Sequence, residues 1–380
     1  MEKYIILQKV SVLLSIFSYS TQTQYTSIFS FGDSYTDTGN KVILSGPGTP
    51  NLWITKPPYG MTFFGHPTGR LSDGRLIIDF IAEALGLPLL PPSLAKNQNF
   101  KQGANFAVAG ATTLKQDGAA DVHAGGVRLP PPSNISLGDE LGWFDAMKPS
   151  LCSSPQACKE YFGKALFVVG ELGWNDYGVM LVSGGKSVAE VQSYVPRIVA
   201  TISAATEKLI NDGATAIVVS GLSPLGCAPG NLVFLGSQNA ADYEPDTGCL
   251  KSLNLLSQAH NSQLRRALAG LAGRHPGARI TYGDLYTPVV GFAASPARYG
   301  FAGGGGAGGA LRACCGAGGG RYNFNLSAAC GMPGVGAIGD PAAFVNWDGV
   351  HLTEAANHRI ADGWLKGPYA QPPILNLSTA

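Results

Sequence analysis

Ile28-Phe29-Ser30-Phe31-Gly32-Asp33-Ser34 is an apolar run that ends in a glycine, an acid and a serine. We expect this run to form a buried strand, with the hydroxyl group of Ser34 at its carboxyl end. Far along the chain, Asp348-Gly349-Val350-His351 supplies a carboxylate and an imidazole three positions apart. A hydroxyl, an imidazole and a carboxylate are the parts of an activated nucleophile. The chain order of Ser34, Asp348 and His351, with the last two almost adjacent, makes these residues the first candidates for a functional site.

Continuous apolar runs and helical patterns alternate along the chain. Such runs suit strands that are buried on both faces of a parallel sheet. The expected strands are Ser27–Gly32, Ala104–Ala109, Ala165–Gly170, Thr215–Gly221 and Arg279–Tyr282. The expected helices are Leu76–Leu85, Val188–Asn211 (interrupted by Pro196), Leu253–Ala272 and Thr353–Leu365, which begins with an N-cap threonine. The alternation predicts one doubly wound α/β sandwich.

One candidate residue follows each of three expected strands. In a sheet of this kind the ligand site lies beyond the carboxyl ends of the strands. Ser34 follows the first strand, Gly110 the second and Asn175 the third. We therefore expect these three residues to lie at one site.

Composition excludes some classes of partner. The chain has 380 residues, of which 45% are hydrophobic, so it can bury a large core. Its net charge is +1, and only 13% of its residues are charged. No block of Lys or Arg forms a phosphate-binding stripe, so nucleic acid is not an expected partner. The 51 glycines and 25 prolines indicate a loop-rich surface.

The N-terminus has the features of a targeting segment. Lys3 gives a small positive region, and an apolar stretch covers residues 10–17. We expect residues 1–24 to be a cleaved secretory signal and residues 25–380 to be a single domain, secreted to the apoplast or vacuole. A cytosolic protein with a flexible start is the alternative. The segment is too short and too polar to span a bilayer, so no stable membrane anchor is expected.

Seven cysteines fit an oxidising compartment. Spacing alone does not fix their connectivity. We expect three bridges: Cys152–Cys158, Cys227–Cys249, and Cys330 with either Cys314 or Cys315. A zinc site is the alternative, but neither a Cys-x-x-Cys pair nor a nearby cluster of histidines supports it. Three candidate glycosylation sequons, consistent with secretion, begin at Asn134, Asn325 and Asn376.

The glycine run Gly303–Gly309 is similar to a phosphate-binding loop only in composition. No Gly-Lys-Ser/Thr follows it, so we interpret it as a surface loop. No metal or organic cofactor is expected.

Five motif blocks occur in order along the chain. They are Phe31-Gly32-Asp33-Ser34 with Asp37-Thr38-Gly39-Asn40, then Pro67-Thr68-Gly69-Arg70-Leu71-Ser72-Asp73-Gly74-Arg75, Asn105-Phe106-Ala107-Val108-Ala109-Gly110-Ala111-Thr112, Gly170-Glu171-Leu172-Gly173-Trp174-Asn175-Asp176-Tyr177 and Trp347-Asp348-Gly349-Val350-His351-Leu352-Thr353. With these blocks the chain resembles the plant GDSL esterase/lipases of the SGNH hydrolase superfamily over essentially its whole mature length. It is most similar to the branch with sinapine-esterase-like and acetylajmalan-esterase-like enzymes. The resemblance implies a three-layer α/β/α sandwich with a mostly parallel, flavodoxin-like sheet of five strands.

The resemblance also implies a role for each candidate residue. Ser34 is expected to be the nucleophile, His351 the general base, and Asp348 the acid that orients the imidazole. The backbone N–H groups of Ser34 and Gly110 and the side-chain amide of Asn175 are expected to form an oxyanion hole. These residue types suit the roles, because serine needs a base to take its proton and a developing oxyanion needs neutral donors.

The polar residues near the candidate site are expected to have a structural role. Asp33, Asp37, Asn40 and Asp176 are expected to hold the turns by local hydrogen bonds. Trp174 departs from the plant branch, which usually has a small residue before the asparagine. We expect its indole either to shape the acyl pocket or to pack into a neighbouring loop.

The expected activity is hydrolysis of a carboxylic ester through an acyl-serine intermediate. The same site also suits an acyltransferase that uses an alcohol in place of water. A catalytically silent protein of this fold that binds carbohydrate or lipid is an alternative of another class. Candidate substrates are short-acyl esters of cell-wall sugars, phenolic choline esters and alkaloid esters.

Overall fold

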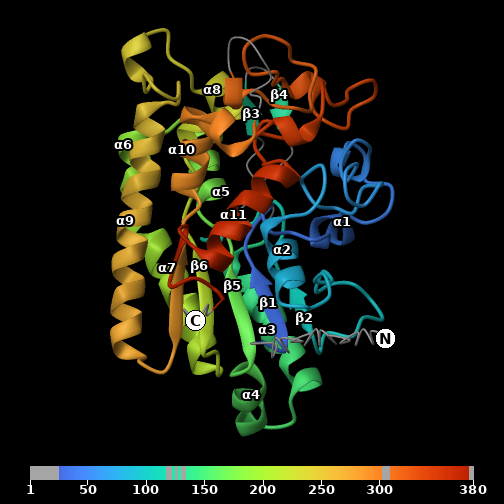
Figure 1. Cartoon of the computed structure of the whole chain (residues 1–380), viewed down its shortest axis with the longest axis vertical. Coiled ribbons are helices and arrows are strands. Elements are labelled where there is room, and N and C mark those ends of the chain that lie inside the picture. Colours follow the sequence, from blue (N-terminus) through green and yellow to red (C-terminus); the bar gives the residue numbers. More distant parts are fainter. Residues whose placement is uncertain (1–24, 117–121, 125–126, 130–133, 302–308, 376–380) are drawn as a thin grey trace, which may run out of the picture.

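The computed structural model describes residues 25–116, 122–124, 127–129, 134–301 and 309–375. Its centre is a sheet with helices on both faces (Figure 1). The strand order is β2-β1-β5-β6-β7-β8. The strands are β1 (Ser27–Phe31), β2 (Gly103–Asn105), β5 (Ala165–Val169), β6 (Ala216–Ser220), β7 (Arg279–Gly283) and β8 (Ala370–Gln371).

All strands of this sheet are parallel except β8, which is antiparallel to β7. The prediction of an α/β sandwich with a mostly parallel sheet is confirmed. The expected sheet of five strands lacks β8, which pairs with Tyr282 and Gly283. This strand has only two residues and lies between Pro368 and Pro372, so no apolar run marks it in the sequence.

Strand β2 is shorter than expected, because it ends at Asn105 and not at Ala109. The side chain of Asn105 accepts a hydrogen bond from the N–H of Ala107 (2.9 Å) and donates one to the carbonyl of Thr36 (2.6 Å). These local bonds turn the chain out of the strand. The segment after β2 still lies beside β1, since the N–H of Phe106 donates to the carbonyl of Ser30 (2.7 Å).

Alternate side chains of the strands point into two separate cores. Phe29 and Phe167 lie in the core that α3, α4, α7 and α9 cover, whereas Ile28 and Val168 lie in the core that α2, α10 and α11 cover. The helices are α2 (Ile77–Ala84), α3 (Leu137–Leu151), α4 (Pro155–Phe162), α7 (Val195–Asn211), α9 (Lys251–Arg274), α10 (Tyr286–Ala294) and α11 (Glu354–Lys366).

The expected helix over 188–211 is two helices, α6 (Val188–Gln192) and α7. Pro196 lies in the first turn of α7, where its missing N–H breaks no intrahelical bond. Helix α11 begins after Thr353, whose hydroxyl accepts a hydrogen bond from the N–H of Ala356 (3.2 Å). The N-cap predicted there is confirmed. Helices α3, α4 and α10 were not predicted, and Pro149 inside α3 obscures its pattern.

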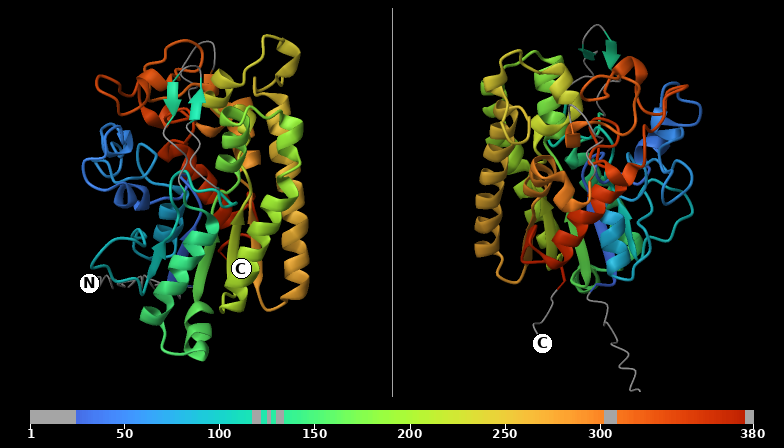
Figure 2. Two further views of the ribbon diagram at one scale, coloured as in Figure 1. Left: turned by 180° about the vertical axis from the view of Figure 1, so that it is seen from behind. Right: turned by 45° about the horizontal axis from the view of Figure 1, so that its top comes forward.

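Short elements gather at the carboxyl end of the sheet. They are α1 (Asn40–Ser45), α5 (Trp174–Gly178), α8 (Pro229–Phe234) and the antiparallel hairpin of β3 (Val122–Ala124) and β4 (Val127–Leu129). Figures 1 and 2 show α8 and the hairpin at the same end of the molecule. Single turns of 3-10 or π helix are Trp53–Thr55, Val179–Ser183, Leu225–Cys227, Ala240–Asp242, Pro296–Tyr299, Gly309–Leu311, Leu326–Ala328 and Pro341–Ala343.

Three disulfide bonds are present: Cys152–Cys158, Cys227–Cys249 and Cys315–Cys330. The third cysteine of the last cluster, Cys314, is free and buried. Burial raises the pKa of its thiol to about 12. The geometry therefore assigns Cys315, and not Cys314, as the partner that the sequence left open.

Some sequence expectations concern residues outside the described ones. These are the signal over 1–24, the sequon at Asn376, and the glycine run apart from Gly309. The two other sequon asparagines, Asn134 and Asn325, are exposed. Among the described residues, we find no helix of sufficient length and apolar character to cross a membrane.

Candidate active site

The candidate nucleophile lies in a tight turn directly after β1. The N–H groups of Thr36 and Asp37 donate to the carbonyl of Asp33 (3.1 and 2.9 Å), so the chain folds back immediately after the strand. Gly32 has a φ of 138°, and a Cβ atom on it would lie 3.1 Å from the Cα of Gly170. The turn therefore packs closely against the end of β5, and the space and backbone conformation at position 32 favour glycine.

Ser34, His351 and Asp348 form a continuous chain of hydrogen bonds. Oγ of Ser34 lies 2.8 Å from Nε2 of His351. Nδ1 of the same ring lies 2.8 and 3.0 Å from the two carboxylate oxygens of Asp348. The serine is 7% exposed and the histidine 8%. The three residues thus meet at the carboxyl end of β1, with the hydroxyl close to the surface.

The carboxylate of Asp348 has several further donors. Its Oδ1 accepts the backbone N–H groups of Val350 (3.1 Å) and His351 (2.9 Å), and its Oδ2 accepts the hydroxyl of Tyr59 (2.8 Å). Burial acts to raise the pKa of Asp348, but the positive charge and hydrogen bonds of His351 outweigh it and hold the pKa below its ordinary value. The carboxylate therefore stays ionised beside the ring.

A small core fixes the segment that carries Asp348 and His351. The N–H of Trp347 donates to the carbonyl of His351 (2.7 Å), and the N–H of Cys315 donates to the carbonyl of Trp347 (2.6 Å). The ring of Tyr59 meets the fully buried indole of Trp347 edge to face, with centroids 5.9 Å apart. Through Cys315, this core also includes the bridge to Cys330.

The second motif block anchors the start of α11, directly after His351. Oδ1 of Asp73 accepts the N–H of Glu354 (2.7 Å), and the hydroxyl of Ser72 donates to the carbonyl of Leu352 (3.1 Å). Arg75 forms an ion pair with Glu354 at 2.8 Å. These bonds tie the histidine segment to residues that lie far away in the sequence.

Asn175 lies in the first turn of α5. Its Nδ2 atom donates to Oδ2 of Asp33 (3.0 Å) and to the carbonyl of Ala111 (2.9 Å). Both amide hydrogens are therefore engaged in this state. The bond to Asp33 brings the amide to the residue that precedes Ser34.

Gly110 lies in the segment after β2, with a φ of 84°. Asp37 binds this segment to the serine turn, because its Oδ2 accepts the N–H of Ala109 (2.8 Å). Among the described residues, we find no hydrogen-bond acceptor for the backbone N–H groups of Ser34 and Gly110. The backbone N–H groups of Ser34 and Gly110 are thus two unpaired donors among the described residues.

The acids and amides that were expected to be structural hold these turns. Asp37 also accepts the N–H groups of Gly39 and Asn40 (2.7 Å each). Asp176 accepts the N–H groups of Thr113 (2.8 Å) and Leu114 (3.0 Å). Asn40 donates to the carbonyls of Asn105 and Ala107.

Sequence reasoning gave no role to Glu171, although it belongs to the fourth motif block. Its side chain is buried, neither of its carboxyl oxygens has a hydrogen-bond partner among the described residues, and it interacts electrostatically with Asp33. Burial raises the pKa of Asp33 to about 6, while burial and the adjacent Asp33 raise that of Glu171 well above its ordinary value. Both pKa shifts favour the protonated form of these buried carboxyl groups.

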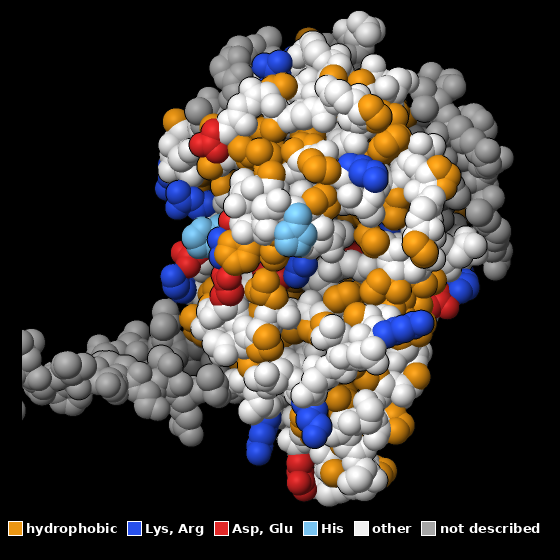
Figure 3. All heavy atoms as spheres, turned by 90° about the vertical axis from the view of Figure 1, so that its right-hand side faces the viewer, with side chains coloured by type: hydrophobic (Ala, Val, Ile, Leu, Met, Phe, Trp, Pro, Cys, Tyr) orange, Lys and Arg blue, Asp and Glu red, His pale blue; other side chains and the backbone are white. Residues whose placement is uncertain are grey.

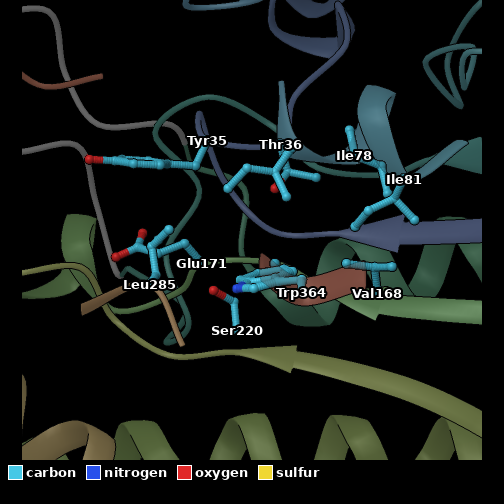
Figure 4. A pocket seen from close by; sticks show the side chains of 11 residues that line it. Tyr35, Thr36, Ile78, Ile81, Val168, Glu171, Ser220, Leu285 and Trp364 are labelled. Atoms are coloured by element: carbon cyan, nitrogen blue, oxygen red, sulfur yellow. The ribbon is translucent and has the colours of Figure 1, made fainter. Parts of the chain in front are cut away.

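A small internal cavity of about 10 Å³ lies beneath the serine turn. Figure 4 shows Tyr35 and Glu171 on one side of it and Ile78, Ile81 and Val168 on the other.

The hydroxyl of Tyr35 donates to the carbonyl of Val350 (2.8 Å). Tyr35 therefore connects the serine turn to the histidine segment, and neither Tyr35 nor Tyr59 carried a signal in the sequence.

A larger pocket of about 430 Å³ opens beside the site. Gly110, Asn175 and Val350 line it, and so does Trp174, a residue that is 9% exposed. The other lining residues are mostly apolar and include Trp53, Tyr59, Val179, Val182, Phe234 and Phe324. Figure 3 shows the side of the molecule with α1, where hydrophobic side chains are widespread and the Lys and Arg side chains are scattered.

In the part of the chain that the structure describes, no group of three or more His, Cys, Asp or Glu side chains is arranged to hold a metal ion. His260, which lies near Gly173, is a buried core residue: its Nδ1 is 2.9 Å from the hydroxyl of Tyr177, and burial lowers its pKa to about 3.

A serine, an imidazole and a carboxylate in hydrogen-bonded series, at the carboxyl edge of a parallel sheet, define the class of serine hydrolases with an α/β fold. Within that class, the model of the GDSL-like Lipase/Acylhydrolase family matches residues 28–364. The chain belongs to this family, and the protein is a serine hydrolase of ester bonds.

Curated relatives agree with this assignment. GDSL esterase/lipase At1g28590 of Arabidopsis thaliana is 45% identical over 367 residues, covering 95% of this chain and 88% of the relative. GDSL esterase/lipase At1g31550 of the same plant is also 45% identical over 367 residues, covering 96% and 90%. GDSL esterase/lipase At5g45910 is 43% identical over 354 residues, covering 92% of each chain.

Proposed function

We propose that the protein hydrolyses a carboxylic ester through an acyl-enzyme intermediate on Ser34. The observation that carries the proposal is the unbroken series from Asp348 through His351 to Ser34, with contacts of 2.8 Å on both sides of the ring. Imidazole accepts and returns a proton near neutral pH, and an ionised carboxylate on its far side stabilises the imidazolium form.

The proposed reaction has two halves. Oγ of Ser34 attacks the ester carbonyl carbon while its proton passes to Nε2 of His351. The tetrahedral intermediate collapses, the C–O bond of the ester breaks, and His351 gives the proton to the leaving alcohol. Water then attacks the acyl-serine with the same base, which releases the acid and restores Ser34.

The unpaired N–H groups of Ser34 and Gly110 support an oxyanion hole at this place. Asn175 supplies the third donor in the proposal. Because both of its amide hydrogens are engaged in the free protein, one must be shared with the oxyanion. We assign that change to the bond with the Ala111 carbonyl, since the bond to Asp33 keeps the amide beside Ser34.

The pocket supports a substrate ester with an apolar body. Trp174 forms part of its wall beside Asn175, so its indole limits the length of the acyl chain in this proposal. The short-acyl and phenolic esters expected from the sequence both fit a pocket with aromatic walls.

We also propose that the protein is secreted and glycosylated. The three disulfide bonds support a signal over residues 1–24 and a secreted domain over residues 25–380. Exposure of Asn134 and Asn325 supports glycosylation at those sequons.

The test is Ser34→Ala with a short p-nitrophenyl ester as substrate. We expect hydrolysis to fall to the background rate. Ser30→Ala is the matched control, because Ser30 lies on the same strand with a buried hydroxyl group that has no partner among the described residues. Wild-type turnover by the Ser34→Ala protein would rule out the mechanism.

A further inference from the structure

The pocket beside Asn175 contains a cationic side chain that the proposed reaction does not use. Lys41 lines the pocket, and none of the described residues that line it is Asp or Glu. The side chain of Lys41 is only partly exposed. No described residue forms a hydrogen bond or an ion pair with its ammonium group.

The charge of Lys41 is incompletely compensated. Burial lowers the pKa of its ammonium group, and the nearby Asp37 opposes this effect. Asp37 is itself fully buried, and its two carboxylate oxygens accept the N–H groups of Gly39, Asn40, Lys41 and Ala109. That carboxylate therefore binds backbone N–H groups, and the pocket that Lys41 lines has no Asp or Glu among its described lining residues.

Asp37 also links the backbone of Lys41 to the segment that carries Gly110. Oδ2 of Asp37 accepts both the N–H of Lys41 (3.0 Å) and the N–H of Ala109 (2.8 Å), and Ala109 precedes Gly110. Lys41 thus belongs to the wall that carries one of the two unpaired N–H groups.

The rest of the pocket is suited to an apolar body. Five aromatic side chains line it: Trp53, Tyr59, Trp174, Phe234 and Phe324. Asn51 and Asn231 add neutral polar groups. A volume of about 430 Å³ is in the range of pockets that enclose small organic ligands.

We propose that this pocket binds an ester that combines an aromatic or apolar body with a carboxylate, and that Lys41 binds the carboxylate. The inference rests on the proposed esterase function and narrows its substrate class. A charged hydrogen bond from a partly desolvated ammonium group favours an anionic ligand. The same charge disfavours esters of cationic alcohols such as choline.

The experiment compares esters that carry an anionic, a neutral or a cationic group at the same position. On the acyl side, the mono-p-nitrophenyl ester of glutaric acid is set against p-nitrophenyl valerate and the p-nitrophenyl ester of trimethylammoniobutyric acid. On the alcohol side, p-carboxyphenyl butyrate is set against phenyl butyrate. The two sets cover both orientations of the ester in the pocket.

Lys41→Gln removes the charge. We expect it to lower the ratio of kcat/KM for an anionic ester to that for its neutral counterpart by about tenfold in at least one set, chiefly through KM. Lys41→Arg keeps most of the ratio, and Lys41→Glu shifts it toward the cationic ester. Lys56→Gln is the control for long-range attraction, because Lys56 is exposed and does not line the pocket.

An unchanged ratio in both sets, or an equal change with Lys56→Gln, would overturn the role of Lys41. Failure of the underlying esterase proposal has a different signature, since the wild-type protein would then hydrolyse neither the neutral nor the anionic esters.

Discussion

The hydroxyl group of Tyr59 lies 2.8 Å from Oδ2 of Asp348 and donates a hydrogen bond to it across 289 positions of the sequence. The other oxygen of this carboxylate accepts two backbone N–H groups. Tyr59 therefore completes the set of donors that holds the carboxylate toward His351. A phenol far from the motif that contains Asp348 is thus part of the site's geometry.

Tyr59→Phe tests that contact. Removing a hydrogen bond to a charged group costs about 1.5 to 3 kcal/mol, so we expect kcat to fall by about tenfold or more. Tyr161→Phe is the control, because its hydroxyl group donates to the carbonyl of Lys101, away from the site. Steady-state kinetics on a short p-nitrophenyl ester measure the effect. Equal kcat values for the two variants would show that Asp348 does not depend on Tyr59.

Asn175→Ala tests the proposed third donor of the oxyanion hole. Loss of one such donor removes about 3 kcal/mol of transition-state stabilisation, so kcat is expected to fall by about a hundredfold with KM little changed. The melting temperature must be measured alongside, because Asn175 also holds Asp33 and Ala111. A loss confined to KM would assign Asn175 to substrate binding instead.

Glu171→Gln tests the raised pKa of Glu171. A folded-state pKa raised above the ordinary value of 4.5 means that the folded protein holds more protons than the unfolded chain above about pH 4.5. The group's contribution to stability is therefore fully present at acid pH and is lost as the pH rises. Asp176 faces Glu171 as well and strengthens the effect.

The glutamine variant keeps a neutral donor in place of the protonated acid. We expect its melting temperature to fall less steeply than that of the wild type between pH 4.5 and pH 8. Glu160→Gln, on the exposed surface of α4, serves as the control and is expected to follow the wild type. Parallel curves for all three proteins would mean that Glu171 ionises normally.

Trp174→Gly tests the role of the indole in the pocket. The change opens the wall beside Asn175, so we expect the ratio of kcat/KM for long to short acyl chains to rise by about tenfold on a p-nitrophenyl ester series. The residue belongs to the core, so a lower melting temperature is expected in addition. An unchanged chain-length preference in the folded variant would assign the indole to packing alone.

Much of the fold follows from local sequence. The strands β1, β5 and β6 are continuous apolar runs, because both of their faces are covered by helices. The predicted strand β2 was too long. The observed strand ends at Asn105, whose side chain binds the carbonyl of Thr36, and this contact depends on the tertiary fold. Strand β8 has no apolar pattern in the sequence. Its two residues follow α11 and pair with β7.

Some residues of the candidate site could likewise be predicted from the sequence, and others could not. Ser34, Asp348 and His351 were predicted for two reasons. A hydroxyl, a carboxylate and an imidazole together are typical of an activated nucleophile, and the motifs around these residues are several residues long. The roles of Tyr59, Glu171 and Lys41 were not predicted. Each depends on a contact or a pocket wall that the tertiary fold creates, and a tyrosine or lysine in a loop has no distinctive spacing.

Ser34 is the residue that we propose to form the covalent intermediate. The direct measurement is labelling of the purified protein with a fluorophosphonate, followed by mass spectrometry of the peptides. We predict one label per chain on Ser34, its loss in Ser34→Ala, and a parallel loss of ester hydrolysis as labelling proceeds. A label on another residue, or full activity after complete labelling, would contradict the claim.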